Sequence, residues 1–350
     1  MPDLDLTIAR GAAPSGWDET IRSLGGTLFH TSLWAAYLAR PGVEPWYILR
    51  RSGDRPVGAT LALFRRSGHP LVGALVRSLS ITAHPCVADR PGERVPEFLD
   101  LVERAARAEG CAELHLESWM SASSPFLPAE HGYREIERLE FTVDLTAAKE
   151  TLWSAMKKDQ RERVRHLERE GVTVELGAAR ADLTVLQSMQ ESTQERRSRQ
   201  GLGYEIEADE AFYDRVHAKL VAPGIGRLFV ARLHGEPAAA IFFHAWNGQA
   251  YSMFSGSTPE GYKLGAQTLL YWRAVEHFKA EGFTLLNRGG VAASSAVEGN
   301  PLHGLYRFKT RLGTTPVTCR SGVKVLRPGL LRLLGFIRRA AGRGTGEGDS

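Results

Sequence analysis

A short segment near the end of the printed sequence combines aromatic and basic residues in a way that suits acyl transfer. It contains Tyr306, Phe308 and Lys309 and follows a loop of glycine, asparagine and proline at residues 298–301. A lysine braced by Phe308 and Tyr306 is a fixed positive charge, which can stabilise an oxygen that becomes negative while an acyl group is transferred. Most Phe-Lys pairs are simply a core ring beside a solvated charge, so the case for Lys309 depends on the rest of the chain.

A second group of basic residues recurs every four positions, which on a helix forms one basic stripe. The stripe consists of Lys157, Arg161, Arg165 and Arg169. Such a stripe can follow a nucleic-acid backbone. Three glutamates are interleaved with it, at positions 162, 168 and 170, and charged runs of this kind are also typical of a solvated helix face. Both interpretations remain open from the sequence.

Composition describes an ordinary globular protein with a mild basic excess. The chain has 350 residues, enough for two domains, with 43% hydrophobic and 24% charged residues and a formal charge of +4. Its three cysteines are widely separated, which favours neither a disulfide framework nor a zinc site. The histidines lack metal-ligand spacing and no nucleophile motif stands out, so we expect no metal and no resident cofactor.

Localisation follows from the same composition. The sequence shows neither an export signal nor an apolar run of the ~18 residues that span a bilayer, which predicts a cytoplasmic protein. Residues 330–339 form an apolar stretch edged by arginines. This segment is either a terminal helix packed on the core or a peripheral contact at the inner face of the membrane.

Hydrophobic periodicity predicts a mixed α/β protein in both halves of the chain. The expected strands are 46–50, 57–64, 113–117, 140–144, 226–233, 237–246, 250–255 and 284–287. The expected helices are 96–109, 152–170, 183–197, 210–220 and 264–280. Strands that alternate with helices predict mixed central sheets flanked by helices.

The order of several motifs resembles the Fem family of aminoacyltransferases. The matching segments are 141–145, 152–153, 161–174, 191–196, 251–257, 269–274, 287–290 and the Phe308-Lys309 pair, with a thinner likeness at 29–34. The resemblance implies two GNAT-like (acyl-CoA N-acyltransferase fold) domains. It places the first, acceptor-side domain at 1–147 plus about 317–340, the second, donor-side domain at 148–316, and a flexible tail at 341–350.

The resemblance also implies roles for individual residues. Lys309, beside Phe308, would stabilise the oxyanion, and Arg196, or its neighbour Arg197, would meet a phosphate of the acceptor, although a solvated helix end explains these arginines equally well. Tyr251 is either a substrate hydrogen-bonding group or a packing residue. Trp34 belongs to the opening segment and would bind substrate. One departure is Asn287, which stands where the family commonly has aspartate.

A helix that starts near residue 265 offers a second donor site. Free backbone N–H groups at a helix start bind anions, and a coenzyme A pyrophosphate lies at this place in ordinary acetyltransferases. Their loop usually reads Gln/Arg-x-x-Gly-x-Gly/Ala, whereas this chain has Tyr-Lys-Leu-Gly-Ala-Gln at 262–267. Gly265 is retained, and Lys263 adds a positive charge, but the flanking positions differ. Donor-side candidates are thus Lys263, Gly265, Arg161 and Arg165.

We therefore expect an enzyme that moves an amino acid from aminoacyl-tRNA to an amine of a peptide-like acceptor, either a peptidoglycan precursor or a peptide natural product. The first alternative is an N-acyltransferase of the same fold that uses acyl-CoA as co-substrate. The second is a non-catalytic protein that binds a cell-wall precursor or tRNA. The sequence leaves open the amino acid, the acceptor amine and the oligomeric state.

Overall fold

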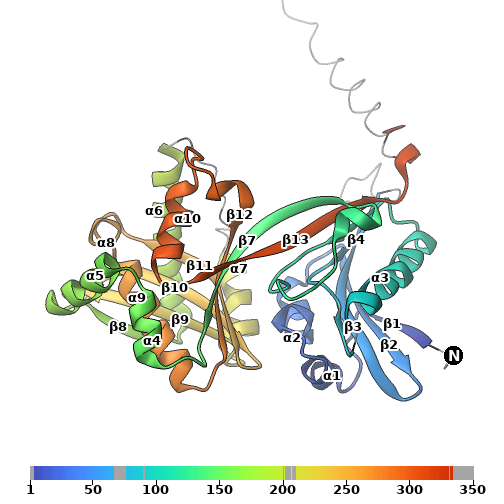
Figure 1. Ribbon diagram of the computed structural model, residues 1–350, viewed down its shortest axis with the longest axis horizontal. Helices are drawn as coiled ribbons and strands as arrows, with labels where there is room; N and C mark the ends of the chain where they lie inside the picture. Colours follow the sequence, from blue (N-terminus) through green and yellow to red (C-terminus); the bar gives the residue numbers. More distant parts are fainter. Residues whose placement is uncertain are drawn as a thin grey trace, which may run out of the picture. The chain divides into compact units, whose positions relative to one another are not determined.

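The computed structural model describes residues 4–66, 76–89, 91–199, 201, 206, 210–330 and 332–333. The chain forms two compact units, one of Met1–Ile136 with Arg320–Ser350 and one of Glu137–Cys319. Two long strands, β7 (Arg134–Asp144) and β13 (Thr315–Val325), lead the chain from the first unit into the second and back again (Figure 1). Each unit is a sheet covered by helices.

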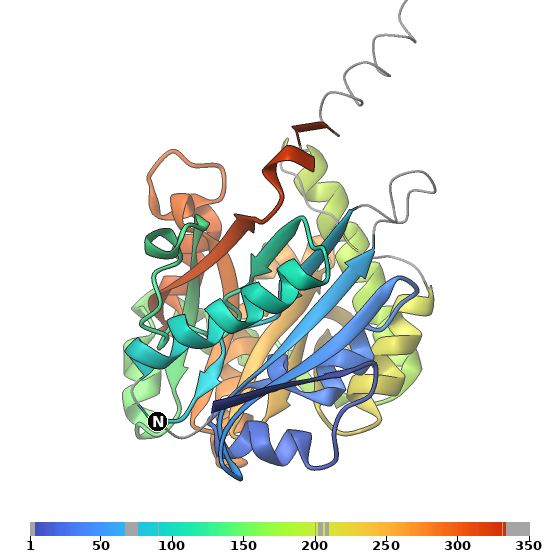
Figure 2. The ribbon, with the colours of Figure 1, turned by 90° about the vertical axis from the view of Figure 1, so that its right-hand side faces the viewer.

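In its described residues, the first unit contains six strands in addition to its parts of β7 and β13. Its elements are β1 (Leu4–Arg10), α1 (Trp17–Ser23), η1 (Leu28–His30), α2 (Ser32–Leu38), β2 (Val43–Ser52), β3 (Arg55–Arg66), β4 (Arg77–Ile81), β5 (Cys86–Val87), α3 (Pro91–Ala108), β6 (Glu113–Leu116) and η2 (Pro128–His131). The strand order is β1-β2-β3-β4-β6-β13, with β5 beside β3. Strands β4 and β6 are parallel and are connected through α3, which lies across the sheet in Figure 2.

Alternation along β2 explains why both faces of this sheet are covered. Trp46 and Ile48 point to one face, where they join a buried cluster with Phe98 of α3. Tyr47 lies between them and points to the other face, where its ring centroid is 5.2 Å from that of Trp17 in α1. Successive side chains of a strand point to opposite faces, so one apolar run supplies both layers of core.

The second unit repeats this plan. Its elements, besides its parts of β7 and β13, are α4 (Lys149–Ala155), α5 (Lys158–Arg169), β8 (Thr173–Gly177), α6 (Arg180–Arg199), α7 (Glu210–Val216), η3 (His217–Val221), β9 (Gly226–Leu233), β10 (Glu236–Trp246), β11 (Gln249–Ser257), α8 (Pro259–Leu264), α9 (Ala266–Ala280), β12 (Leu285–Ala292), η4 (Ala293–Ala296) and α10 (His303–Arg311). The order β7-β12-β11-β10-β9-β8 has β11 and β12 parallel, connected through α8 and α9.

Strand β10 divides the second core between two faces of the sheet. Phe243 packs against Phe278 of α9, with ring centroids 5.3 Å apart. The preceding residue, Phe242, contacts Phe254 of β11, which in turn meets Phe212 of α7. Helices pack against both faces of the sheet, so the residues of β10 form a nearly continuous buried run and do not alternate between buried and exposed.

The parallel pairing of β11 with β12 is short. It covers three residue pairs and ends with Tyr251 beside Asn287. Beyond that point β11 continues to pair with β10, and β12 continues to pair with β7. The ends of the two strands beyond this pair belong to the site described below.

The mixed α/β class, with central sheets flanked by helices, is confirmed. One expected helix is wrong in extent. The helix expected at 152–170 is interrupted at Met156 and Lys157, which adopt extended backbone, and the Lys157 amide donates to the Arg311 carbonyl at 2.9 Å. The helix expected from about residue 264 to 280 is confirmed as α9, and the left-handed conformation of Gly265 (φ 74°) separates it from α8.

The two expected domain boundaries, near residues 147 and 317, differ from those of the compact units at 136/137 and 319/320. The reason is that residues 138–144 of β7 pair with β12 of the second unit. The expected terminal segment 330–339 and tail 341–350 lie outside the described residues, apart from Leu330, Arg332 and Leu333. In the described part of the chain, no helix is both long enough and apolar enough to cross a bilayer.

Candidate active site

A β-bulge in β12 lies at the centre of the candidate site. The register with β7 advances by three residues on β12, from Asn287 to Gly290, while β7 advances by only two. Gly289, inside the bulge, has φ of 70°, which glycine adopts without steric cost. Its amide donates to Asn287 Oδ1 at 2.9 Å and closes the turn. Bulges redirect backbone and side-chain groups and are frequent beside active sites.

A buried carboxylate, Glu140, holds this bulge in place. Its side chain is fully buried, and Oε2 accepts a hydrogen bond from Asn287 Nδ2 at 2.6 Å. Its Oε1 lies 3.3 Å from Arg138 Nη2, which also donates to the Tyr251 hydroxyl at 3.2 Å. Residues from β7, β11 and β12 therefore form one polar network. Where the sequence has asparagine in place of the family's usual aspartate, Glu140 of the neighbouring strand supplies the negative charge.

Helix α10 brings Lys309 to the same bulge. Lys309 is 8% exposed, and its Nζ donates to the Arg288 carbonyl at 2.6 Å. A Cβ added to Gly289 would lie 3.7 Å from Lys309 Nζ and 3.8 Å from the Tyr251 hydroxyl. The polar ends of both side chains thus face the same glycine, and an acyl carbonyl bound there would meet two hydrogen-bonding groups.

The surroundings of Lys309 make its amine unusually acidic. Burial, followed by the positive charges of Arg288 and Arg138, lowers the pKa of Lys309 to about 7, while the charge of Glu140 opposes this shift. A pKa near 7 means that this amine exchanges its proton in the physiological range, where an ordinary lysine does not. Tyr251 is different, since burial and then the charge of Glu140 raise its pKa, so its hydroxyl stays protonated.

Phe308 does not brace Lys309, contrary to the expectation from sequence. Successive residues on a helix point about 100° apart, so the two side chains diverge. The ring beside Lys309 is Phe141 of β7, with Nζ 5.3 Å from its centroid, and Tyr306 supports that ring from α10. Phe308 instead contacts Tyr271 of α9, with ring centroids 6.4 Å apart.

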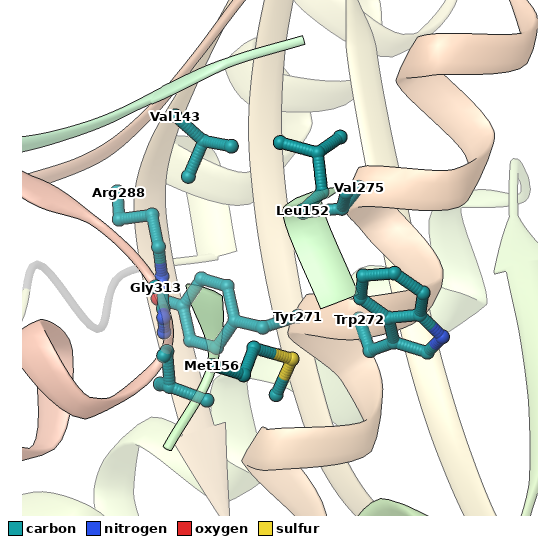
Figure 3. A pocket seen from close by; sticks show the side chains of 9 residues that line it. Val143, Leu152, Met156, Tyr271, Trp272, Val275, Arg288 and Gly313 are labelled. Atoms are coloured by element: carbon teal, nitrogen blue, oxygen red, sulfur yellow. The ribbon is translucent and has the colours of Figure 1, made fainter. Parts of the chain in front are cut away.

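A pocket lies on the side of α10 to which Phe308 points. It is lined by Val143, Leu152, Met156, Tyr271, Trp272, Val275, Arg288, Leu312 and Gly313. Figure 3 shows the Arg288 side chain lying beside the Tyr271 ring. The guanidinium carbon is 2.8 Å from the centroid of that ring and 5.7 Å from the centroid of Phe308. The side chains that line the pocket are apolar apart from this charge, the tyrosine hydroxyl and the indole N–H of Trp272.

The two arginines considered for phosphate binding lie in different surroundings. Arg196 stacks on Tyr262 of α8, 3.8 Å from the ring centroid. Arg197 is near enough to Lys309 for its charge to lower the pKa of that lysine. The charge of Arg197 therefore acts on the lysine at the bulge.

The start of α9 contains the expected anion-binding loop. Gly265 is its N-cap, without a side-chain cap, and Lys263 lies in the last turn of α8. Arg163 reaches this loop from α5 and donates to the Leu264 carbonyl at 3.2 Å. A Cβ at Gly265 would be 2.5 Å from the Arg163 guanidinium, so only glycine allows this approach. The sequence did not single out Arg163, because it lies among other charged residues and its contact with Leu264 is far away in the chain.

The basic stripe is interrupted in the structure. Lys157 lies outside the helix, and Arg161 donates to the carbonyls of Ser154 and Met156, which end α4. The Arg165 guanidinium lies 5.5 Å from the centroid of Trp153. Two members of the stripe thus also have local structural contacts, and its contact with a nucleic-acid backbone stays a prediction.

Trp34 belongs to the first unit and is 4% exposed. It lies on α2, where its ring contacts Phe29 and Tyr37 at centroid distances of 5.0 and 4.9 Å. These contacts make it a core residue of that unit. Across the described residues, no three His, Cys, Asp or Glu side chains gather as they do around a metal ion.

Sequence reasoning found Lys309 and Tyr251 but missed the charged groups around them. Arg138 and Glu140 occur in a run of alternating charges at 134–140, which looks like a solvated surface. Arg288 follows Asn287 in an otherwise apolar strand. A charged residue inside such a strand was the available signal, but its partners come from distant parts of the chain.

The fold of the second unit and the site at its bulge agree with a known family of protein domains. Residues 154–310 match the family of acetyltransferase (GNAT) domains, and that segment includes β11, α9, the bulge of β12 and Lys309. The second unit thus resembles an acetyltransferase (GNAT) domain over most of its length. No curated protein is detectably similar to the chain in sequence.

Solved structures extend the likeness over nearly the whole chain. A crystal structure of FemX has a TM-score of 0.73 at 14% identity, and the match covers 93% of this chain and 99% of that one. L-PGS from Bacillus licheniformis has a TM-score of 0.55 at 15% identity, with 95% and 98% covered. A tandem GNAT protein from the clavulanic acid biosynthesis pathway has 0.50 at 16%, with 91% and 97% covered. The resemblance to Fem-type proteins is confirmed in the fold.

Proposed function

We propose that the protein transfers an amino acid from aminoacyl-tRNA to an amine of a peptide-like acceptor and so forms a peptide bond. The observation that carries this proposal is the position of Lys309, buried at a β-bulge with its Nζ beside Gly289. The fold of FemX supports the same choice of reaction class. The acceptor is a peptidoglycan precursor or a peptide natural product.

The reaction needs a group that stabilises the negative charge that develops on the reacting oxygen. The acceptor amine attacks the ester carbonyl carbon, a C–N bond forms, and the carbonyl oxygen becomes an oxyanion. Protonated Lys309 stabilises that oxyanion by charge and hydrogen bonding. The C–O bond to the tRNA ribose then breaks, and the amine proton passes to the leaving oxygen directly or through water. The products are an amide and a free ribose hydroxyl.

A specific observation favours a second donor, acyl-CoA. The start of α9 combines uncapped backbone N–H groups with the Arg163 side chain and nearby Lys263. Two cations at a helix N-terminus suit a pyrophosphate. The same bulge and Lys309 would serve this reaction, since a thioester also passes through an oxyanion.

The experiment that separates these donors supplies radiolabelled charged tRNAs or labelled acetyl-CoA, together with a mixture of peptidoglycan precursors. Label that moves from tRNA only, and that ribonuclease abolishes, supports the proposal. Transfer from acetyl-CoA alone would replace tRNA by acyl-CoA as donor. Binding of precursor or tRNA that is unchanged in Lys309→Ala, with no transfer by either protein, would indicate a non-catalytic role.

We expect the pH dependence of turnover to report the protonation of Lys309. Because its folded-state pKa is about 7, the amine is charged below that pH and neutral above it. Oxyanion stabilisation needs the charged form, so kcat/KM, which reports the free enzyme, should fall as pH rises through about 7. The ¹³Cε resonance of Lys309 in lysine-labelled protein, identified by its absence in Lys309→Met, should titrate over the same range. A kcat/KM that rises through this range would instead make neutral Lys309 the proton acceptor for the amine.

The same pKa predicts the direction in which the free energy of unfolding changes with pH. The unfolded lysine keeps its proton up to about 10.5, the reference value from which the folded pKa is lowered. Between pH 7 and 10.5 the unfolded state thus binds one more proton, and this residue's contribution to the free energy of unfolding rises with pH. The cost of burying the charged amine is present in full below pH 7.

A further inference from the structure

An exposed tyrosine and an arginine stack on each other beside the start of α9. The guanidinium carbon of Arg196, in the last turn of α6, lies 3.8 Å from the ring centroid of Tyr262 in α8. Arg196 covers one face of the ring, and 54% of Tyr262 stays exposed. Among the described residues, Tyr262 is the only phenylalanine, tyrosine or tryptophan that is exposed. The pair therefore offers a flat surface to a ligand from solution.

Positive charge surrounds this stack. Lys263 follows Tyr262 in the chain and is also exposed. Arg163 reaches the next residue from α5, where its Nη1 donates to the Leu264 carbonyl at 3.2 Å. The acidic residue of this helix is Glu260, in the first turn of α8. The cations on this side of the stack thus outnumber the carboxylates.

The last turn of α6 adds further positive charge on the other side. Besides Arg196 it contains Arg197 and Arg199. Arg199 is paired with Glu195 at 3.3 Å, but both side chains are more than two-thirds exposed, so this pair is weak. A ligand that carries several negative charges matches such a surface.

Strand β11 leads from the bulge to the stack. It carries Tyr251 near its start, whose hydroxyl faces Gly289, and it ends one residue before α8 begins. At the usual rise of a strand, this part of β11 spans about 20 Å. Arg197, which follows Arg196, is near enough to Lys309 for its charge to lower the pKa of that lysine. An extended ligand that reacts at the bulge can therefore also reach the stack.

A nucleobase is the planar group that this surface suits. Every base has a π-face, and exposed aromatic rings and arginine planes bind unpaired bases by stacking. Nearby lysine and arginine side chains attract the phosphates that connect the bases. The amino acid of an aminoacyl-tRNA is esterified to an unpaired 3′ end, so its bases lie within a few nucleotides of the reacting ester. A peptide acceptor lacks such a series of planar groups linked by phosphates.

We propose that the Arg196–Tyr262 stack binds an unpaired base near the 3′ end of the RNA donor, while Lys263 and Arg163 contact the adjoining phosphates. This inference rests on the proposed function, because it requires an RNA donor. It assigns Arg196 to the donor, where the sequence predicted a contact with a phosphate of the acceptor.

The test is the binding of uncharged RNA hairpins to the full-length protein at one fixed salt concentration, measured by fluorescence anisotropy. One hairpin ends in a single-stranded 3′ CCA segment, and the other has the same stem with a blunt end. The single-stranded end should strengthen binding at least tenfold. Equal binding of the two hairpins would overturn this inference and leave the RNA donor standing. No binding of either hairpin would remove the RNA donor, and the inference with it.

Coenzyme A carries the other nucleotide that a donor of this fold could present. An excess of coenzyme A should not displace the hairpin that has the single-stranded end. Displacement would assign the stack to an acyl-CoA donor and would overturn the inference.

Variants of Tyr262 locate the base. Tyr262→Ala should weaken binding of the hairpin with the single-stranded end at least fivefold and leave the blunt hairpin unchanged, whereas Tyr262→Phe keeps the ring and should retain the affinity. Leu176→Ala is the matched control, because Leu176 is 49% exposed on β8 of the same unit. It should bind like the unmodified protein. A loss that is equal for both hairpins, that Tyr262→Phe shares or that Leu176→Ala reproduces would contradict stacking on this ring.

A change that conserves charge separates stacking from phosphate contact at Arg196. Arg196→Lys keeps the positive charge but removes the planar group that lies on the Tyr262 ring. The affinity for the hairpin with the single-stranded end should fall at least threefold. Full affinity in this variant would make Arg196 a charge contact and overturn its part in the stack.

Discussion

Replacing Lys309 by methionine should lower kcat by about 100- to 1,000-fold, the usual effect of removing one preorganised donor to an oxyanion. The methionine fills a similar volume but carries neither charge nor N–H. Lys309 is held at its position by the Arg288 carbonyl and the face of Phe141, so the cation is already in place before substrate binds. The KM for the donor should change little, because this interaction develops only in the transition state.

Lys279→Met is the matched control for this prediction. Lys279 is also a lysine that donates to backbone carbonyls, those of Leu145 and Ala147 at 2.9 and 2.7 Å, but it lies away from the bulge. Its loss should reduce stability and leave kcat close to that of the unmodified protein. A folded Lys309→Met enzyme with less than a tenfold decrease in kcat would remove the oxyanion role, and equal losses in both variants would indicate a general effect on folding.

The sequence was most informative where local pattern determines structure. Strands β9 and β10 were predicted nearly to the residue, because their apolar runs end at turn residues on each side. Helix α6 was predicted at 183–197 and is observed at Arg180–Arg199. The interruption at Met156 was missed, since the region continues a helical pattern and only a tertiary contact, from the Lys157 amide to the Arg311 carbonyl, accompanies the break.

The site shows the same division. Lys309 and Tyr251 were recognised from motif order, which local sequence carries. The register shift at Gly289 and the pairing of Glu140 with Asn287 join residues almost 150 positions apart, since the hydrogen bond spans a separation of 147. Neither propensity nor spacing encodes such a contact. The orientation of Phe308 away from Lys309 was likewise predictable only once α10 was known to be a helix.

Replacing Glu140 by alanine should destabilise the second unit by about 3–5 kcal/mol, the range for removing one partner of a buried ion pair. The change leaves Arg138 without its carboxylate and the Asn287 amide without its 2.6 Å acceptor, both in the interior. Denaturation by urea, followed by a probe in the second unit, measures the difference. A loss below about 1 kcal/mol, the scale of an ordinary hydrogen bond, would mean that Glu140 does not hold the bulge.

Exchanging the two hydrogen-bonding groups tests the same network without removing it. Asn287→Asp alone should be destabilising, because it puts a second carboxylate 2.6 Å from Glu140 Oε2, where like charges repel and no N–H remains. Adding Glu140→Gln restores a donor on the opposite side, while the new carboxylate at position 287 can still accept from the Gly289 amide. The double variant should therefore be more stable than Asn287→Asp. Additive losses would show that geometry alone, and not this hydrogen bond, positions the bulge on which Lys309 depends.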